Sequence, residues 1–291
     1  MTEFYSPLRY PGGKAALSGF LVAVLEHNDL VEPHYVEPYA GGAGAALRLL
    51  FEEYVESVTI NDADPRIGSF WKSVTEYNEQ MIELTQNAEL DVSEWQRQRS
   101  IYLNCSSSNV LELGFATFYL NRTTRSGIVH NGGPIGGYNQ SGTYKIDARF
   151  NSERLCERLA RIGAYSDRIT VTSKDGASLL HDVDRKSRKD NRYFAYIDPP
   201  YYVKGAELYM NRFSPDDHRA LANFLNLDHG FQWIMSYDDV PEIRDMYPAH
   251  SQKSFYLSYS AYKRRRGQEV LIWPSNVEVP DELFGELPAV A

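Results

Sequence analysis

The sequence predicts an α/β protein with an open sheet, in which strands and helices alternate along the chain. Short runs rich in aromatic and β-branched residues are typical of buried strands. They occupy residues 35–37, 55–60, 169–173, 193–197 and 231–236. Two further runs, 254–262 and 269–273, are predicted to pair as antiparallel strands that close the sheet. An open α/β sheet places its ligands at the carboxyl ends of its strands, so the residues that follow each strand are the candidates for a site.

The composition limits the class of protein. The chain has 291 residues, enough for one large domain or for one domain with an insertion. A hydrophobic fraction of 43% and an aromatic fraction of 13% exclude a disordered chain. The net charge of -9 argues against a general nucleic-acid coat protein, but it is compatible with a DNA enzyme whose basic residues lie on one face.

The sequence contains no sign of a membrane segment or of a metal site. No apolar run is long enough to span a bilayer, and the N-terminus lacks a signal pattern, so we expect a cytoplasmic protein. The two cysteines, Cys105 and Cys156, have no metal-ligand spacing, and we therefore expect no metal.

A glycine-rich loop follows the first strand. The strand ends at Glu37, the loop contains Gly41 and Gly44, and residues 45–54 have a helical pattern. This order is typical of the first half of a nucleotide-binding βαβ unit. Asp62, which follows the next strand, lies 18 residues beyond Gly44, close to the ~20-residue spacing at which an acid binds a ribose. A P-loop is excluded because no Gly-Lys-Ser/Thr follows the glycines.

The stretch Asp198-Pro199-Pro200-Tyr201 follows the buried strand 193–197. Its two prolines exclude helix and ladder pairing, and they direct rigid backbone carbonyls away from the chain. A carboxylate, a proline carbonyl and an aromatic ring therefore meet within four residues, which suits the binding of a planar base by its amino group. The alternative is an Asp-Pro turn that only closes the strand.

Three basic segments are candidates for contacts with ligands or phosphates. Lys14 follows Pro-Gly-Gly at the start of a helical pattern over 15–27, so it either binds a ligand or is a solvated lysine. Residues 122–145 are glycine-rich and contain no Asp or Glu, which suits either a surface that faces phosphates or a flexible solvated loop. The four cations at 263–266 lie between the last two strands and form either a DNA clamp or a solvated turn.

The middle of the chain is predicted to be mostly helical. Residues 73–100 are polar with helical spacing and have a candidate N-cap at Asp91. Residues 109–121 carry apolar residues on nearly every side, as in a buried helix. Further helices are predicted at 153–162, after a cap at Ser214, and at 241–247, and residues 184–191 are predicted to form a loop.

Several motifs occur in a characteristic order. They are Leu8-Arg9-Tyr10-Pro11-Gly12-Gly13-Lys14, Val36-Glu37-Pro38-Tyr39-Ala40-Gly41-Gly42-Ala43-Gly44, Ile60-Asn61-Asp62, Leu120-Asn121-Arg122-Thr123 and Asp198-Pro199-Pro200-Tyr201. Over most of the chain this series resembles the Dam-like DNA adenine N6-methyltransferases, in the order of their alpha group. The resemblance implies a Rossmann-like S-adenosylmethionine-dependent methyltransferase sheet, mostly parallel, with a closing antiparallel hairpin. It also implies a catalytic domain of residues 1–71 and 151–291, and a small, mainly helical target-recognition insertion over 72–150.

The resemblance further implies a reaction. The enzyme would transfer a methyl group from S-adenosyl-L-methionine to N6 of a flipped-out adenine in duplex DNA, and would release S-adenosyl-L-homocysteine. The catalytic residues would be Asp198, Pro199 and Tyr201, with the amine held by the Asp198 carboxylate and the Pro199 carbonyl and the base stacked on Tyr201.

The predicted binding residues fall into two sets. By the resemblance, the cofactor would be bound by Tyr10, Pro11, Gly12, Lys14, Glu37, Tyr39, Gly41, Asp62, Asp175 and Asp198. With the basic segments included, the DNA would be bound by Arg9, Arg122, Arg125, Lys145, Lys263, Arg264, Arg265 and Arg266.

Related activities stay open at this point. Methylation of cytosine N4, of RNA adenine or of a protein glutamine would use similar chemistry. Relatives that act on cytosine N4 often carry Ser in place of Asp198, and those that act on glutamine tend to carry Asn. A nicotinamide-dependent oxidoreductase would use Asp62 but leaves Asp-Pro-Pro-Tyr unexplained, and a non-catalytic DNA-binding module is disfavoured by the intact Asp198, Pro199 and Tyr201. We expect a monomer in a bacterial or phage-infected cell, with a cognate restriction endonuclease as a candidate partner. The recognition sequence stays open.

Overall fold

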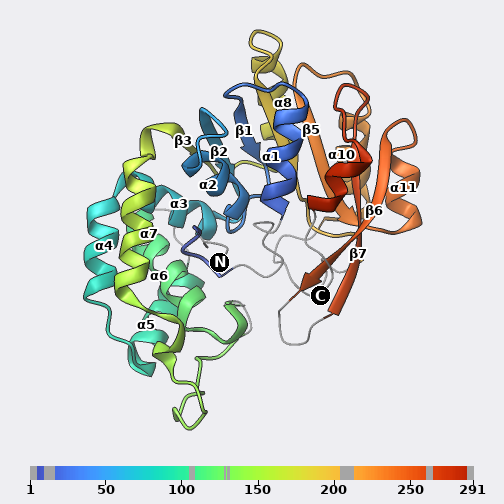
Figure 1. Ribbon diagram of the computed structural model, residues 1–291. Helices are drawn as coiled ribbons and strands as arrows, with labels where there is room; N and C mark the ends of the chain where they lie inside the picture. The colour runs from blue at the N-terminus through green and yellow to red at the C-terminus, as the bar shows by residue number, and fades with distance from the viewer. Residues whose placement is uncertain are drawn as a thin grey trace.

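The computed structural model describes residues 5–9, 17–104, 109–127, 129, 132–203, 213–259 and 265–286. This part of the chain contains one seven-stranded sheet in the order β3-β2-β1-β4-β5-β7-β6 (Figure 1). The strands are β1 (His34–Glu37), β2 (Ser57–Asn61), β3 (Ile169–Thr172), β4 (Tyr193–Ile197), β5 (Gln232–Asp238), β6 (Ser251–Tyr259) and β7 (Arg265–Trp273). Strands β1 to β5 are parallel, whereas β7 lies antiparallel between β5 and β6. The predicted mostly parallel sheet with a closing antiparallel hairpin is therefore confirmed.

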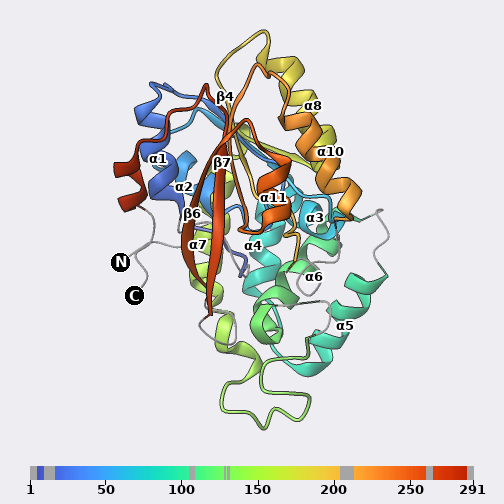
Figure 2. The same ribbon diagram turned by 90° about the vertical axis from the view of Figure 1, so that its right-hand side faces the viewer.

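Helices cover both faces of the sheet. Figure 2 shows α1 (Ser18–His27) and α2 (Gly44–Phe51) on one side, and α8 (Gly176–Ser187), α10 (Pro215–Leu225) and α11 (Pro241–Met246) on the other. Alternate strand residues enter the two cores, as the period of two of a β-strand requires. Tyr35 and Tyr196 pack with the α1 and α2 side, whereas Val36 and Ile197 pack with the α8 side. Glu37 follows Tyr35 by two residues, so its side chain lies on the α1 and α2 side as well.

Five helices form a layer beside the β3 edge of the sheet (Figure 1). They are α3 (Pro65–Glu76), α4 (Asn78–Gln86), α5 (Val92–Leu103), α6 (Val110–Thr123) and α7 (Ser152–Ala164). The predicted buried helix at 109–121 is confirmed as α6, which lies at the centre of this layer and is buried almost throughout. At Gly114 an added Cβ would lie 2.2 Å from Ser73 Oγ and 2.6 Å from the carbonyl of Ser69, so a glycine is needed where α6 crosses α3. The residue 72 at which the predicted insertion begins lies inside α3.

One secondary-structure prediction is wrong. Residues 184–191 were predicted to form a loop, but α8 continues to Ser187. The polar residues of this last turn lie on its exposed face, where Asp184 pairs with Arg188 at i and i+4. Ion pairs at this spacing support a helix whose other face is apolar, and here Val183 and Ser187 are buried.

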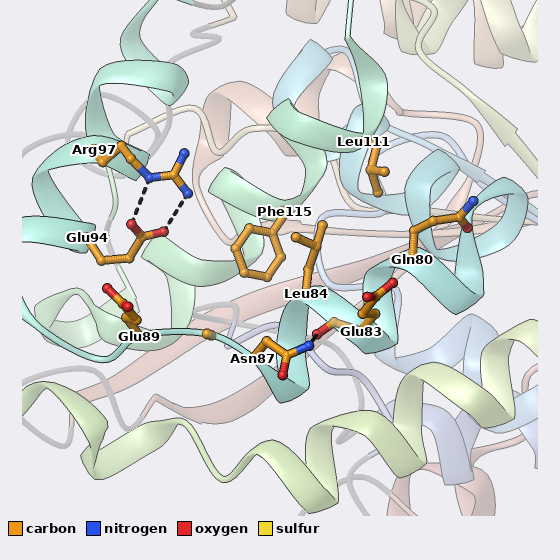
Figure 3. A pocket seen from close by; sticks show the side chains of 10 residues that line it. Gln80, Glu83, Leu84, Asn87, Glu89, Glu94, Arg97, Leu111 and Phe115 are labelled. Atoms are coloured by element: carbon orange, nitrogen blue, oxygen red, sulfur yellow. Dashed lines mark hydrogen bonds and ion pairs between the residues drawn. The ribbon is translucent and has the colours of Figure 1, made fainter.

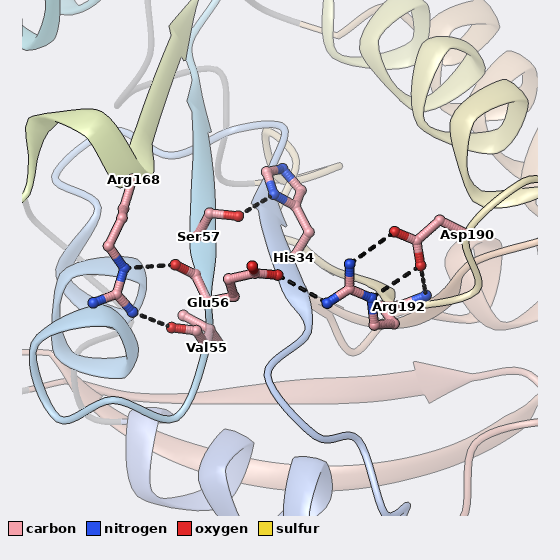
Figure 4. A network of polar contacts seen from close by, with 7 residues as sticks. All are labelled: His34, Val55, Glu56, Ser57, Arg168, Asp190 and Arg192. Carbon is pink, nitrogen blue, oxygen red and sulfur yellow. Dashed lines mark hydrogen bonds and ion pairs between the residues drawn. The ribbon is translucent and has the colours of Figure 1, made fainter.

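The amino-terminal edge of the sheet is held by a polar network (Figure 4). Arg168 donates from Nε to the carbonyl of Glu56 at 2.6 Å, and Arg192 donates to the Glu56 carboxylate at 2.9 Å. The ring of His34 contacts Ser57 Oγ through Nδ1 at 2.7 Å, and burial lowers the pKa of this imidazole to about 4. These links connect the amino-terminal ends of the strands. Ligands bind at the opposite, carboxyl ends of such strands.

The carboxyl ends of β1, β2 and β3 are joined by the buried side chain of Asn61. Its Nδ2 donates to the carbonyls of Pro38 at 2.7 Å and Lys174 at 3.0 Å. Its Oδ1 accepts from Thr172 Oγ1 at 2.7 Å and from the backbone N–H of Lys174 at 2.9 Å. One amide therefore uses both of its donors and accepts twice, and it fixes the two loops that follow β1 and β3.

Replacement of this amide tests its structural role. Asn61→Ala leaves several buried polar groups without partners, so we expect the free energy of unfolding to fall by roughly 2–4 kcal/mol. Urea denaturation measures this change. Asn87→Ala is the matched control, because the side chain of the exposed Asn87 donates to the carbonyl of Glu83 in the helix that it caps, and we expect its effect to be below about 0.5 kcal/mol. Equal effects of the two substitutions would contradict this role for Asn61.

Candidate active site

The site begins at Glu37, the last residue of β1. Its carboxyl is buried, and Oε1 accepts from the Tyr35 hydroxyl at 3.0 Å and from the backbone N–H of Ala46 at 2.9 Å. Burial, with a smaller contribution from the charge of Asp198, raises the pKa of Glu37 to about 8, although the two hydrogen-bond donors act in the opposite direction. Glu37 is therefore mostly protonated at neutral pH.

The loop after β1 turns sharply into α2. Gly41 and Ala43 have positive φ values of 47° and 45°, in the left-handed region that favours glycine. The carbonyl of Gly41 accepts from Trp71 Nε1 at 2.9 Å, and its N–H donates to Asp62 Oδ2 at 3.1 Å. The predicted glycine loop is therefore bound to the carboxylate at the end of the neighbouring strand.

Asp62 uses both of its oxygens without exhausting them. Oδ2 accepts from Gly41, and Oδ1 accepts from the backbone N–H of Asp64 at 2.9 Å. Each carboxylate oxygen has two lone pairs, so each can accept a further hydrogen bond from a ligand hydroxyl. Burial raises the pKa of Asp62 to about 6.

Tyr39 and Asp175 lie between β1 and the start of α8. The Tyr39 ring packs against Gly176, where an added Cβ would lie 2.3 Å from the ring, and it meets Phe213 edge-on at 5.7 Å. The Tyr39 hydroxyl is buried and has no hydrogen-bond partner among the residues that the structure describes. Asp175 caps α8 by accepting from the backbone N–H of Ser178 at 2.9 Å.

Asp198 follows β4 at the point where the strand order reverses, between β1 and β4. Its Oδ1 accepts from Ser236 Oγ at 2.9 Å, and Ser236 Oγ lies 2.6 Å from the Tyr196 hydroxyl. The Tyr201 hydroxyl donates to Glu269 Oε1 at 2.5 Å, and the Tyr201 side chain is only 8% exposed. The predicted catalytic residues are thus held by side chains from other strands.

The backbone after the two prolines is fixed by Asp238 at the end of β5. Its Oδ1 accepts from the N–H of Tyr202 at 2.9 Å, and its Oδ2 accepts from the N–H of Val203 at 2.8 Å. Sequence reasoning missed Ser236, Asp238 and Glu269. Polar side chains within otherwise apolar strands were the available signal, but their partners depend on the pairing of β5 with β4 and β7.

The basic residues near the N-terminus meet the end of α6. Asn121 binds the backbone of Arg9 from both sides, since it accepts from the Arg9 N–H at 2.7 Å and donates to its carbonyl at 2.8 Å. Arg122 donates from Nε to the carbonyl of Arg149 at 2.8 Å. Burial, together with the positive charges of Arg9, Arg158 and Arg149, lowers the pKa of Arg122 to about 10. Several positively charged arginines therefore lie close together at the end of α6.

The remaining predicted residues are placed only in part. Arg125 and Lys145 are exposed, and Lys145 Nζ donates to the carbonyl of Gln140 at 2.5 Å. The backbone of Arg265 and Arg266 begins β7, and their side chains lie outside the described residues. Also outside the described residues are Tyr10, Pro11, Gly12, Lys14, Lys263 and Arg264.

A separate pocket lies between α4, α5 and α6 (Figure 3). Its lining includes the apolar side chains of Leu84 and Phe115 and the carboxylates of Glu83, Glu89 and Glu94. None of the predicted site residues lines it, and its carboxylates do not suit phosphates. Across the described part of the chain, no group of three or more His, Cys, Asp or Glu side chains could hold a metal ion.

Comparison with known proteins identifies the family of the chain. A family model for D12 class N6 adenine-specific DNA methyltransferases matches residues 10–263, most of the chain. The chain belongs to this family. This DNA adenine methyltransferase therefore has the predicted enzyme class, and the readings as an oxidoreductase, a non-catalytic module or a methylase of another amine are set aside. No curated protein matches the chain. In the described part of this methyltransferase, no helix combines the length and apolar character needed to cross a bilayer.

The protonation of Glu37 gives a stability prediction. Because its pKa rises from 4.5 to about 8 on folding, the native state holds an extra proton between these values, and stability falls as the pH rises through this window. Glu37→Gln removes the titration. We expect the variant to lose less stability than the wild type between pH 5 and pH 8.5, by up to roughly 4 kcal/mol.

Urea unfolding at the two pH values, without cofactor, measures the difference. Glu79→Gln, a substitution of an exposed glutamate in α4, should leave the pH dependence as in the wild type. If Glu37→Gln also retained the full pH dependence, Glu37 would not be the group that titrates.

Proposed function

We propose that this protein transfers a methyl group from S-adenosyl-L-methionine to N6 of a specific adenine that is flipped out of duplex DNA. The observation that carries the proposal is the position of Asp198. It follows a parallel strand at the reversal of strand order, its carboxylate is held by Ser236, and the backbone N–H groups of Tyr202 and Val203 are held by Asp238. An open α/β sheet binds its ligands at this point.

The ends of β1 and β2 fit the proposed cofactor. Asp62 has lone pairs left for the two ribose hydroxyls, and the buried Tyr39 hydroxyl lacks a partner within the described residues. Glu37 is a buried acid that a nearby cation would ionise, which suits the positive charges of a sulfonium amino acid. Gly41 lets the backbone approach the ligand closely. When bound, the cofactor would supply an electrophilic methyl group on a positively charged sulfur.

Other cofactor contacts extend this proposal. Tyr10, Pro11, Gly12 and Lys14 would complete the pocket from the N-terminal motif. Asp175 would bind the adenine of the cofactor, and its capping bond to Ser178 uses only Oδ1.

Asp198 and Pro199 would activate the target amine. An exocyclic amino nitrogen is a poor nucleophile because its lone pair is delocalised into the ring. Hydrogen bonds from its two N–H groups to the Asp198 carboxylate and the Pro199 carbonyl would favour a tetrahedral nitrogen with an available lone pair. The same two oxygens would stabilise the positive charge that develops on this nitrogen, and no charge-stabilising group would have to move during the reaction.

Tyr201 would stack on the flipped base. Its hydroxyl bond to Glu269 fixes the ring before the base arrives, so little side-chain entropy would be lost on binding. Stacking of a base on an aromatic ring contributes roughly 1–3 kcal/mol, and removal of a base from the duplex costs a few kcal/mol.

The helical layer would recognise the DNA. In this proposal, residues 72–150 are the target-recognition insertion, and residues 1–71 and 151–291 form the catalytic domain. Arg9 and Arg122 would contact DNA phosphates at the junction between the insertion and the catalytic domain. Arg125, Lys145 and the segment 263–266 would contact the same DNA.

Removal of the catalytic carboxylate tests the reaction. We expect Asp198→Ala to abolish transfer of tritiated methyl groups to DNA, with a loss of at least about a thousandfold, because the amine loses its charged acceptor. Calorimetric titration should show that the variant still binds S-adenosyl-L-methionine. Asp228→Ala, in an exposed loop, is the control and should keep wild-type activity. Normal methyl incorporation by Asp198→Ala would sink the proposal.

The arginine at the end of α6 tests the DNA-binding face. We expect Arg122→Ala to weaken DNA binding for all sequences and to reduce the slope of log affinity against log salt by about one. Arg122→Lys keeps the charge and should restore most of the slope. Arg219→Ala removes an arginine from the exposed surface of α10 and should change neither quantity. An unchanged salt slope in Arg122→Ala would exclude a phosphate contact.

A further inference from the structure

The carboxylate of Asp198 accepts a hydrogen bond from Ser236, a residue outside the motifs that carry the resemblance. Strands β4 and β5 are parallel with Ile197 opposite Met235, so Ser236 is the next residue of β5 beside Asp198. Ser236 is fully buried. Its hydroxyl lies 2.9 Å from Asp198 Oδ1 and 2.6 Å from the Tyr196 hydroxyl.

The direction of these two bonds follows from the number of protons. A serine hydroxyl has one proton. An ionised carboxylate accepts only, so Ser236 donates its proton to Asp198. Tyr196 must then donate to Ser236, and the chain of donors runs from Tyr196 through Ser236 to Asp198. Hydrogen bonds in such a chain polarise one another, and a donor to an ionised group makes a stronger bond than a donor to a neutral one.

We propose that Ser236 and Tyr196 are positioning residues for methyl transfer, which orient the Asp198 carboxylate and keep it ionised so that it can accept a hydrogen bond from the adenine amino group. The inference rests on the proposed function, because it gives Ser236 and Tyr196 a role through Asp198 alone. Neither side chain needs to touch the base or the cofactor.

Acids and phenols lie around the Asp198 carboxylate. The titratable groups that face it are Tyr35 and Glu37 on β1, Tyr196 on β4, Tyr201 after β4, and Tyr237 on β5, with Glu269 of β7 behind Tyr201. A carboxylate in such surroundings is stabilised by hydrogen bonds from hydroxyl groups.

Asp238, the last residue of β5, gives a contrast. It binds the N–H groups of Tyr202 and Val203, and thus holds the backbone after the motif rather than the Asp198 carboxylate. Loss of the Asp238 charge should therefore slow the reaction without a change in the pH at which Asp198 is protonated.

Steady-state kinetics as a function of pH test the proposal. We expect Ser236→Ala to lower kcat by roughly ten- to a hundredfold. The acid limb of its plot of kcat against pH should move to higher pH, because a carboxylate that loses a hydrogen-bond donor is protonated more easily. Tyr196→Phe removes a single oxygen from the end of the chain and should shift the limb in the same direction by a smaller amount. Ser236→Thr keeps the hydroxyl and should restore the wild-type limb.

Controls separate this inference from the proposed function and from misfolding. Calorimetric binding of S-adenosyl-L-methionine reports whether each variant is folded, and Tyr196→Phe gives the answer if Ser236→Ala does not fold. Asp238→Asn should lower kcat but leave the acid limb in place. If Asp198→Ala is inactive while Ser236→Ala and Tyr196→Phe keep the wild-type kcat and acid limb, the positioning role is overturned and the proposed function stands. If Asp198→Ala is active, the proposed function itself fails.

Discussion

Two acids at the centre of the sheet determine how the rest of the site is built. Glu37 ends β1 and Asp198 follows the neighbouring parallel strand β4, and each lies within reach of the other's charge. Ionisation of both acids away from water would be costly. The two acids have different surroundings in the fold. Burial raises the pKa of Glu37 to about 8, so this acid is mostly neutral at pH 7. The Asp198 carboxylate, in contrast, accepts a hydrogen bond from the Ser236 hydroxyl. Pairs of acids with different environments are the usual basis for a division of chemical roles.

The two prolines of the proposed catalytic motif explain why its support must come from other strands. Pro199 and Pro200 have no backbone N–H, so this stretch cannot pair with a neighbouring strand through its own donors. Its rigidity depends instead on side chains behind it. Asp238 accepts the first two N–H groups after the motif tyrosine, and Glu269 accepts the tyrosine hydroxyl. Both acids belong to β5 and β7, whose antiparallel pairing brings them to the end of β4. The closing hairpin is therefore part of the site as well as of the sheet.

The fold could be predicted from the sequence because its strands are short apolar runs and its motifs keep a fixed order. Asp62 and Asp198 were found since each directly follows such a run. The supporting residues were missed because hydrogen bonding between Ser236 and Asp198, 38 residues apart, depends on strand register, which local patterns do not contain. The last turn of α8 was missed for a different reason. Its ion pairs lie on an exposed face, and a polar run of this kind is also typical of a loop.

The states of the two acids also bear on the order of charges in the proposed reaction. The proposed cofactor carries its positive charge on sulfur, next to the methyl group. A cation beside Glu37 favours its ionised form, so cofactor binding would be coupled to the release of a proton near neutral pH. Glu37 would then act as a counter-charge only when the cofactor is present. Asp198 would need no such change, because the Ser236 hydroxyl that donates to it is part of the folded protein. One acid would therefore respond to the methyl donor, while the other is preorganised for the amine that receives the methyl group.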